Sequence, residues 1–205
     1  MYEIKDVKKM METIAQEASK HVDLLAELDG KSGDGDLGET VEKLAKVIIE
    51  GSRRDYDDIG MMLKTDAAEM NRAAPSTLGT LLSMGVMALA KSCRGRSTLD
   101  AEDVAGFPYI LAESIGKSGK AKPGDKTILD ALYPMAETVK STFSETGDLR
   151  ASYRAGAQAA EQGAESTAGM LPKAGRAQWI GERVKDNKDA GAVLCAKTAE
   201  VFLRF

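Results

Sequence analysis

Three aspartates lie close together in the segment LDGKSGDGDLG, which runs from residue 28 to residue 38. Asp29, Asp34 and Asp36 are interleaved there with four glycines. Carboxylates held so close repel one another, and the repulsion is relieved by protonating one of them or by binding a hard cation that prefers oxygen ligands. The glycines let the backbone turn sharply and let a ligand approach it closely. The segment therefore predicts a metal site.

The pattern of the loop favours magnesium over calcium. A calcium EF-hand needs a glutamate at loop position 12, where counting from Asp29 or Asp34 gives Thr40 or Ala45. Magnesium usually takes one or two carboxylates together with phosphate oxygens and water, so a nucleotide would supply the remaining ligands. The amides at the start of the following helix, around Leu37 and Gly38, would then meet the phosphates. The residues alone leave one alternative open, in which Asp34 or Asp36 only caps that helix.

A second segment, GKAKPGDKT at residues 119–127, nearly matches the P-loop pattern but has Asp125 inserted before the lysine. A P-loop also follows a strand, whereas this segment follows a predicted helix, so we reject that interpretation. On residue types alone, Pro123 and Gly124 form a turn and Asp125 starts the next helix.

A third segment, AGRAQWIGER at residues 174–183, places Arg176 between small residues, where its guanidinium could reach phosphate oxygens as a forked donor. Trp179, the only tryptophan, is expected in the core, and the lone His21 is expected to pack beside the apolar face of the first helix. With no other histidine and no evident nucleophile and base pair, covalent or acid-base chemistry by this chain alone is not expected.

The elements that must position these segments are helical. Apolar residues recur at helical spacing along most of the chain, and no stretch shows the alternation typical of strands. We therefore predict a single all-α domain over residues 1–205, an antiparallel up-and-down bundle of about eight helices. Pro108 and Pro134 should mark kinks or breaks. The expected helices cover residues 7–25, 41–48, 57–72, 78–89, 99–118, 126–143, 148–171 and 189–205.

Composition narrows the class of protein. A net charge of -4 with interspersed signs argues against nucleic-acid binding, which needs clustered Lys and Arg. No segment approaches the roughly 20 apolar residues of a membrane span, so a cytoplasmic location is expected. Cys93 and Cys195 are far apart in sequence and fit reduced structural thiols.

The order of the three segments resembles the L subunit of dihydroxyacetone kinases, nearly from end to end. The resemblance is carried by the acidic loop, by PGDKTILDAL at residues 123–132, and by GRA with GER at residues 175–183. It implies an antiparallel barrel of eight helices that binds ADP or ATP among the loops at one end. It also implies that Asp29, Asp34 and Asp36 hold two magnesium ions, which bridge the nucleotide phosphates.

The same resemblance implies a set of nucleotide contacts, with Arg176 also acting as the catalytic residue. One departure is Leu37, where the family usually has histidine, so a side-chain hydrogen bond to the nucleotide is absent. Another is the turn at residues 74–77, which lacks the family's run of glycines. The implied contacts are Leu37, Gly38, Ser76, Thr77, Gly119, Ile128, Arg176, Asp189, Ala190 and Gly191.

The family function needs partner chains. A separate K subunit holds dihydroxyacetone, or a related small ketose, covalently on a histidine and docks at the nucleotide end of the L subunit. The phosphate comes from ATP, or from a phosphohistidine M subunit of the sugar phosphotransferase system that recharges bound ADP. The alternative functions are a nucleotide-sensing regulator that binds a transcription factor and the related domain of fatty-acid kinases. Assembly into a homodimer stays open.

Overall fold

The computed structural model describes residues 1–203, apart from the side chains of Arg176 and Leu203. The two short strands, β1 (Tyr2–Glu3) and β2 (Thr98–Leu99), pair in an antiparallel ladder. All the other regular elements in this part of the chain are helical. The α-helices are α1 Ile4–Ser19, α2 Val22–Ser32, α3 Leu37–Gly51, α4 Ile59–Ala73, α5 Thr77–Ser92, α6 Ala101–Gly119, α7 Leu129–Thr146, α8 Leu149–Ser166 and α9 Ala190–Ala199, and the 3₁₀ helices are η1 Arg176–Trp179, η2 Gly181–Val184 and η3 Glu200–Leu203.

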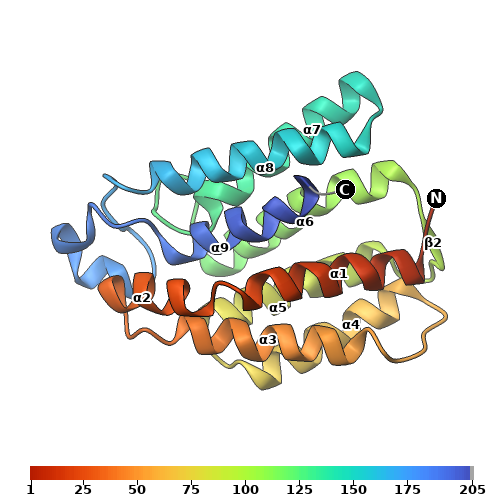
Figure 1. Cartoon of the computed structure of the whole chain (residues 1–205), viewed down its shortest axis with the longest axis horizontal. Helices are drawn as coiled ribbons and strands as arrows, with labels where there is room; N and C mark the ends of the chain where they lie inside the picture. The colour runs from red at the N-terminus through yellow and green to blue at the C-terminus, as the bar shows by residue number, and fades with distance from the viewer. Residues whose placement is uncertain (204–205) are drawn as a thin grey trace.

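The helices form a closed ring. Each of α3 to α9 packs against its neighbour in the chain, α1 packs against α3, and α9 returns to α1. Figure 1 shows the helices lying along the longest axis, with their connections gathered at its two ends. This arrangement confirms the predicted antiparallel, all-α barrel. The ring has eight members, α1 and α3 to α9, because α2 continues from α1 and does not add a member of its own. None of the helices in residues 1–203 has both the length and the apolar character needed to cross a membrane.

The first predicted helix is two helices. The helix expected over residues 7–25 ends at Ser19 and restarts at Val22, although no glycine or proline marks the break. Glu17, which is buried, accepts a hydrogen bond from Lys20 Nζ at 2.8 Å, and His21 Nε2 lies 3.5 Å from its other oxygen. His21 thus lies at the N-cap position of α2 beside a buried carboxylate, and its expected packing against the apolar face stays a prediction. The break matters for the site because α2 carries Asp29.

Other helix limits differ less from the prediction. Three starts near aspartates are confirmed, because Asp58, Asp148 and Asp189 cap α4, α8 and α9 by accepting a backbone amide hydrogen bond. Pro108 and Pro134 lie inside α6 and α7, so neither proline breaks its helix, and the predicted alternative, a kink, stays a prediction. For Pro108 the reason is burial, since its ring lines the apolar interior of the barrel and this packing compensates for the lost hydrogen bond. The final helix ends at residue 199 before η3, and residues 204–205 lie outside the described chain.

Close packing of α7 on α8 closes one side of the ring. The alanine-rich stretch of α8 buries Ala157, Ala160 and Ala164, which confirms that it packs closely. A Cβ on Gly163 would collide with Asp130 O and lie 2.9 Å from the Cα of the next residue. Since Asp130 lies in the first turn of α7, this glycine sets how closely α8 approaches the end of the barrel that carries the acidic loop.

We expect Gly163→Ala to lower the free energy of unfolding by about 1–3 kcal/mol, because the new methyl group meets rigid backbone. The matched control is Gly106→Ala in α6, where an added Cβ has no neighbour within 4 Å. That change should raise stability by up to about 1 kcal/mol through better helix propensity. Urea unfolding monitored by circular dichroism measures both. Equal effects at the two positions would contradict this account of the packing.

A buried carboxylate lies away from the acidic loop, on α4. Asp66 is 2% exposed, and its Oδ1 has no hydrogen-bond partner in the described chain. Burial, reinforced by the charge of Glu69, raises the pKa of Asp66 to about 6, although Arg54 and Lys8 act in the opposite direction. Between about pH 4 and pH 6 the folded protein therefore retains a proton that the unfolded chain has released. The free energy of unfolding should fall as the pH rises across this window.

We expect Asp66→Asn to be more stable than the wild type at pH 8, by about 2–3 kcal/mol for a shift of about two pKa units. Near pH 4, where the folded carboxyl is protonated and the unfolded one is only about half ionised, the difference should fall below about 1 kcal/mol. Denaturant unfolding at the two pH values measures this. The exposed Asp55→Asn serves as the control and should show no such pH-dependent gain. An advantage of Asp66→Asn that is the same at pH 4 and pH 8 would contradict the assignment.

Candidate functional site

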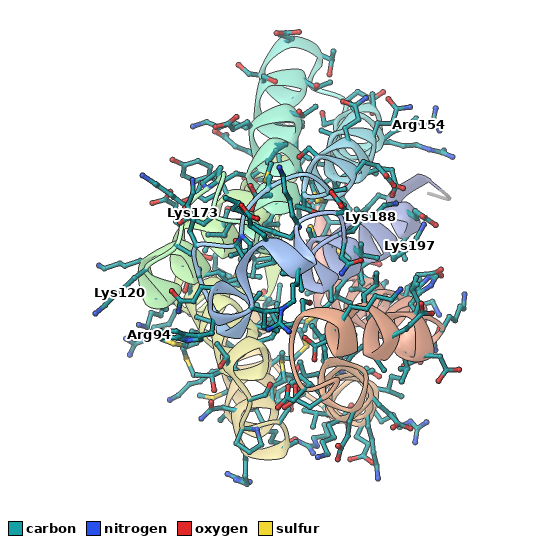
Figure 2. The ribbon with its side chains drawn as sticks, turned by 90° about the vertical axis from the view of Figure 1, so that its left-hand side faces the viewer. Arg94, Lys120, Arg154, Lys173, Lys188 and Lys197 are labelled. Atoms are coloured by element: carbon teal, nitrogen blue, oxygen red, sulfur yellow. The ribbon has the colours of Figure 1, made fainter. Side chains whose placement is uncertain are left out.

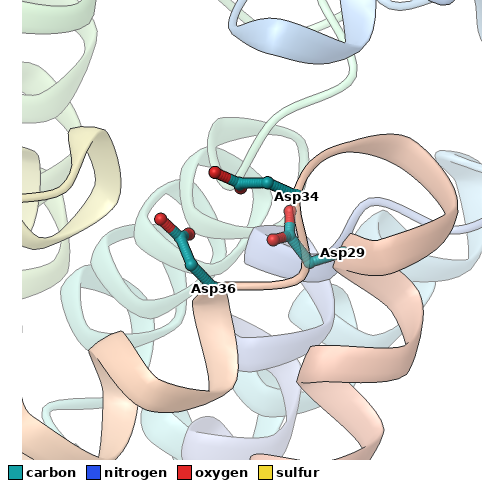
Figure 3. A group of neighbouring side chains, drawn as sticks. All are labelled: Asp29, Asp34 and Asp36. Atoms are coloured by element: carbon teal, nitrogen blue, oxygen red, sulfur yellow. The ribbon is translucent and has the colours of Figure 1, made fainter.

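The three predicted aspartates converge at one end of the barrel. Asp29 lies in the last turn of α2, Asp34 in the connection, and Asp36 at the N-cap position of α3. One oxygen of each carboxylate lies within 4.8 Å of the others. Figure 3 shows the three side chains on the loop that joins α2 to α3. The left-handed backbone of Gly35, with φ 78°, turns the loop back between them. Oxygen donors at this spacing fit a hard divalent cation, and the residues present therefore fit magnesium.

The helix-cap alternative explains little of this cluster. Asp36 occupies the N-cap position of α3, but its side chain makes no capping hydrogen bond. The amide of Leu37 instead donates to Asp29 Oδ2 at 3.3 Å, and Gly33 N donates to Asp29 O at 2.5 Å. Asp29 therefore organises the loop from α2, and Asp36 is placed by the start of α3 without serving as a side-chain cap.

The acidic loop borders a pocket of about 640 Å³ at this end of the barrel. Segments far apart in sequence meet in its wall: the acidic loop, the turn before α5, the end of α6, the start of α7, part of the segment after α8, and the start of α9. Most of the nucleotide contacts expected from the sequence are brought together here. Those that line the pocket beside the three aspartates are Leu37, Ser76, Thr77, Gly119, Ile128, Asp189, Ala190 and Gly191.

Two expected contacts are not placed in the wall. Gly38 is buried between helices, since a Cβ there would lie 2.6 Å from Val22 O. Its observed role is therefore close packing of α3 on α2. The side chain of Arg176 lies outside what the structure describes, although its neighbours Gly175 and Ala177 line the pocket. The catalytic role of Arg176 stays a prediction.

Some residues of the wall were not predicted. Thr40 lies one turn into α3, and its Oγ1 hydrogen bonds to Ser76 Oγ at 3.0 Å, which ties α3 to the turn before α5. Ser76 Oγ also accepts the Gly79 amide at 3.0 Å and caps α5. Helical spacing could have indicated Thr40, because it lies four residues after Asp36 on the same face. Nothing in the sequence indicated that Ser76 would be the hydrogen-bond partner of Thr40.

The near-P-loop segment is a turn that buries its lysine. The helix expected to start at Asp125 starts at Leu129, so that prediction is wrong, because the carboxylate of Asp125 accepts the amide of Lys122 at 2.9 Å and closes a turn. Asp130 accepts the amides of Gly124 and Thr127, at 2.5 and 2.7 Å. These bonds complete the turn and hold it to the first residues of α7.

Rejection of a P-loop is confirmed by the environment of Lys126. Its Nζ donates to Thr167 O and Lys185 O, each at 2.8 Å, and to Asn187 O at 2.6 Å. An ammonium has only three donors, so none is left for a phosphate oxygen.

Asp189 is a partly exposed acid of the pocket wall. It caps α9 by accepting the Ala192 amide at 2.7 Å. Burial raises the pKa of Asp189 to about 7, and the nearby carboxylates of Asp130 and Asp29 add to the rise, whereas the amide bond and Lys126 oppose it. The neighbouring carboxylates therefore add to the pKa shift that burial causes, and a bound cation would oppose it.

Trp179 does not lie in the core, so that prediction is wrong. It was expected in the core, yet it is 84% exposed on η1. The segment that carries it leaves the barrel as two short 3₁₀ helices, so there is no helical face to bury the indole. Leu37, in contrast, is 9% exposed at the edge of the pocket and offers no polar group from its side chain.

The fold and the pocket define an all-α barrel with an acidic site at one end, and comparison with known proteins agrees. The DAK2 domain model matches residues 31–204. The chain belongs to the DAK2 domain family. It is 28% identical over 175 residues to the ADP-binding subunit DhaL of the PEP-dependent dihydroxyacetone kinase of Escherichia coli, covering 85% of this chain and 83% of that protein.

Other relatives are longer. L-erythrulose kinase of Pectobacterium atrosepticum is 31% identical over 175 residues, which cover 84% of this chain but 30% of that protein. The chain thus spans about a third of that kinase. The fold matches the dihydroxyacetone kinase of C. freundii with a TM-score of 0.75 at 22% identity, covering 97% of this chain and 34% of that one. A second structure of that kinase, in complex with AMP-PNP and Mg²⁺, matches with a TM-score of 0.71 at 20% identity, covering 97% and 33%.

We expect magnesium to stabilise the protein through the three aspartates. Asp34→Asn removes one of the crowded charges, so in EDTA its Tm should equal or exceed that of the wild type. Added Mg²⁺ should raise the Tm of the wild type, by the equivalent of about 2.7 kcal/mol at a concentration 100 times Kd, and should raise that of the variant much less. Thermal melts with and without Mg²⁺ measure this, with Asp55→Asn as control. An equal Mg²⁺ response in Asp34→Asn would argue against the site.

Proposed function

We propose that this chain is the nucleotide-binding subunit of a dihydroxyacetone-type kinase. ADP or ATP binds in the pocket, and Asp29, Asp34 and Asp36 hold the magnesium that accompanies its phosphates. The observation that carries the proposal is the convergence of these three carboxylates at the edge of a pocket of about 640 Å³. The similarity to an ADP-binding subunit of comparable length supports it, because 83% of that subunit is covered.

The pocket offers phosphates a second kind of partner, the N-termini of helices. The first residues of α3, α5, α7 and α9, which are Leu37, Thr77, Leu129 and Ala190, all line it. Each helix start carries a partial positive charge, which favours anions, even though first-turn amides such as those of Leu37, Gly79 and Ala192 already donate to side chains. A phosphate chain would lie between these helix ends and the acidic loop. The acidic loop, which would otherwise repel the phosphates, is compatible with them only through a cation.

The residues of the chain have distinct roles in this proposal. The three aspartates orient the cation, and two magnesium ions, as expected from the family, would bridge the phosphates. Magnesium supplies charge neutralisation for phosphoryl transfer, in which alignment matters more than covalent help. Thr40 and Ser76 position the turn before α5, and Arg176 is proposed to reach the transferred phosphoryl group.

The acceptor has to come from another chain. The described residues of the pocket wall include no histidine or cysteine, and the only histidine of the chain, His21, lies at the start of α2 outside that wall. The proposal therefore includes a K subunit that carries dihydroxyacetone or a related small ketose and docks at the pocket. The phosphate would come from ATP, or from a phosphohistidine M subunit that recharges ADP in place.

The test is substitution of Asp34 and Asp36 together by Ala. We expect Kd for Mg·ADP, measured by isothermal titration calorimetry, to rise by about 100-fold or more, since a bound charge loses its direct partners. Phosphoryl transfer to dihydroxyacetone, assayed with a matching K subunit, should be lost. Asp55→Ala, an exposed aspartate beyond the other end of α3, should behave as the wild type. Unchanged binding of nucleotide and magnesium by the double variant would refute the proposal.

A second function is favoured by one observation. Leu37 stands in the pocket wall where the family usually has histidine, so the chain lacks a side-chain hydrogen bond that catalysis could use. A nucleotide-sensing regulator needs binding without transfer. If the wild-type chain binds Mg·ADP but phosphorylates no ketose with a K subunit and ATP, and Leu37→His restores no transfer, the regulatory function replaces the catalytic one.

A further inference from the structure

The segment between α8 and α9 leaves the barrel and returns to it over residues 167–189, which we call the excursion. It carries η1 and η2, and its residues Ala174, Gly175 and Ala177 line the pocket. In Figure 1 it lies at the left-hand end of the barrel, and Figure 2 looks onto this end, where Lys173 and Lys188 are labelled. Its only regular structure is two short 3₁₀ helices, so its position over the pocket depends on how its ends are attached.

One buried ammonium joins the two ends of the excursion. Lys126 is 3% exposed, and its Nζ donates to Thr167 O, where the excursion leaves α8. The same Nζ donates to Lys185 O and Asn187 O, where the excursion returns. All three donors of the ammonium are thereby used, and every acceptor is a main-chain carbonyl of the excursion.

Several backbone bonds extend this attachment. Gly169 N donates to Lys185 O at 2.8 Å, so the carbonyl that accepts from Lys126 also closes the excursion on itself. Asp189 N donates to Thr167 Oγ1 at 2.9 Å, and Lys173 N donates to Asp125 O at 3.0 Å. Both ends are therefore connected to the turn that contains Lys126, and that turn also supplies pocket wall.

The attachment is expensive, which argues that it is not incidental packing. Burial of an ammonium away from water is unfavourable, and here it lowers the pKa of Lys126, although Asp189, Asp186 and Asp130 act to raise it. The backbone at Lys126 is also left-handed, with φ 61°, a conformation that costs a residue with a side chain about 1 kcal/mol or more. Glycine would suit this backbone better, yet only a long cationic side chain can reach the three carbonyls.

We propose that Lys126 is a positioning residue whose ammonium fastens both ends of the excursion to the pocket wall, and so holds Gly175 and Ala177 over the bound nucleotide. This inference rests on the proposed nucleotide site. Lys126 itself does not contact the phosphates, because its donors are occupied. It acts through the excursion, and it determines the position of the residues around Arg176 over the pocket.

The test compares Lys126→Met, which keeps the length and removes the donors, with Lys126→Arg and with the control Lys122→Met. Lys122 is an exposed lysine of the same turn. Hydrogen exchange followed by mass spectrometry should show faster exchange in residues 169–187 of Lys126→Met, by about tenfold or more, the size expected when charged hydrogen bonds are lost. Exchange in α4 and α5 should stay at the wild-type rate.

Nucleotide binding provides the second measurement. Kd for Mg·ADP should rise by about tenfold or more in Lys126→Met, should rise less in Lys126→Arg, and should be unchanged in Lys122→Met. If Lys126→Met does not fold, Lys126→Arg still tests the idea. A guanidinium cannot direct its donors to the same three carbonyls, so exchange at Gly169 and Lys173 should exceed that of the wild type.

Two results would overturn the inference. One is wild-type exchange in residues 169–187 of Lys126→Met, or of Lys126→Arg if the Met variant does not fold. The other is faster exchange spread evenly over the whole barrel, with Mg·ADP affinity unchanged, which would show a purely structural role. Failure of the proposed function would be a separate result, because the wild type itself would then not bind Mg·ADP. The exchange data would still show whether Lys126 attaches the excursion to the pocket wall.

Discussion

Four helices of the barrel, α3, α5, α7 and α9, begin at the same end because neighbouring helices in a closed antiparallel ring alternate in direction. Their first turns, which carry the positive ends of the helix dipoles, therefore gather around one pocket. Such an end of a barrel attracts anions without any lysine or arginine. The rest of the site depends on this constraint. The loops at this end of the barrel determine which anionic ligand binds and which cation binds with it.

The acidic loop lies directly in this positive environment. Without a ligand, the helix ends partly offset the repulsion among Asp29, Asp34 and Asp36, and Asp29 is further stabilised by the amide of Leu37. Once an anionic ligand occupies the helix ends, the carboxylates need a partner of their own. The arrangement is thus suited to a ligand that brings anion and cation together, as a magnesium nucleotide does. Burial raises the pKa of Asp189 to about 7, and the carboxylates of Asp130 and Asp29 add to the rise.

The pocket wall contains groups that bind and orient, and few that react. Under the proposed function, such a wall would hold the nucleotide, and the acceptor would be supplied from outside these residues. It also gives the excursion its importance, because the residues that would cover the nucleotide are not part of the barrel. Their position depends on a buried lysine, and a small change in that attachment would move the cover while leaving the barrel intact.

The sequence by itself determined the helical class, most helix starts and the acidic loop, because these depend on local patterns: apolar spacing, capping aspartates, and carboxylates crowded among glycines. Most of the pocket wall was predicted only by adding the resemblance of three separated segments. The tertiary structure alone decided the break after Ser19, the exposure of Trp179 and the late start of α7. It also decided the role of Lys126, since three carbonyls about 40 to 60 residues further along the chain converge on it. Such contacts depend on where distant segments meet in space, and no local pattern of residues records that.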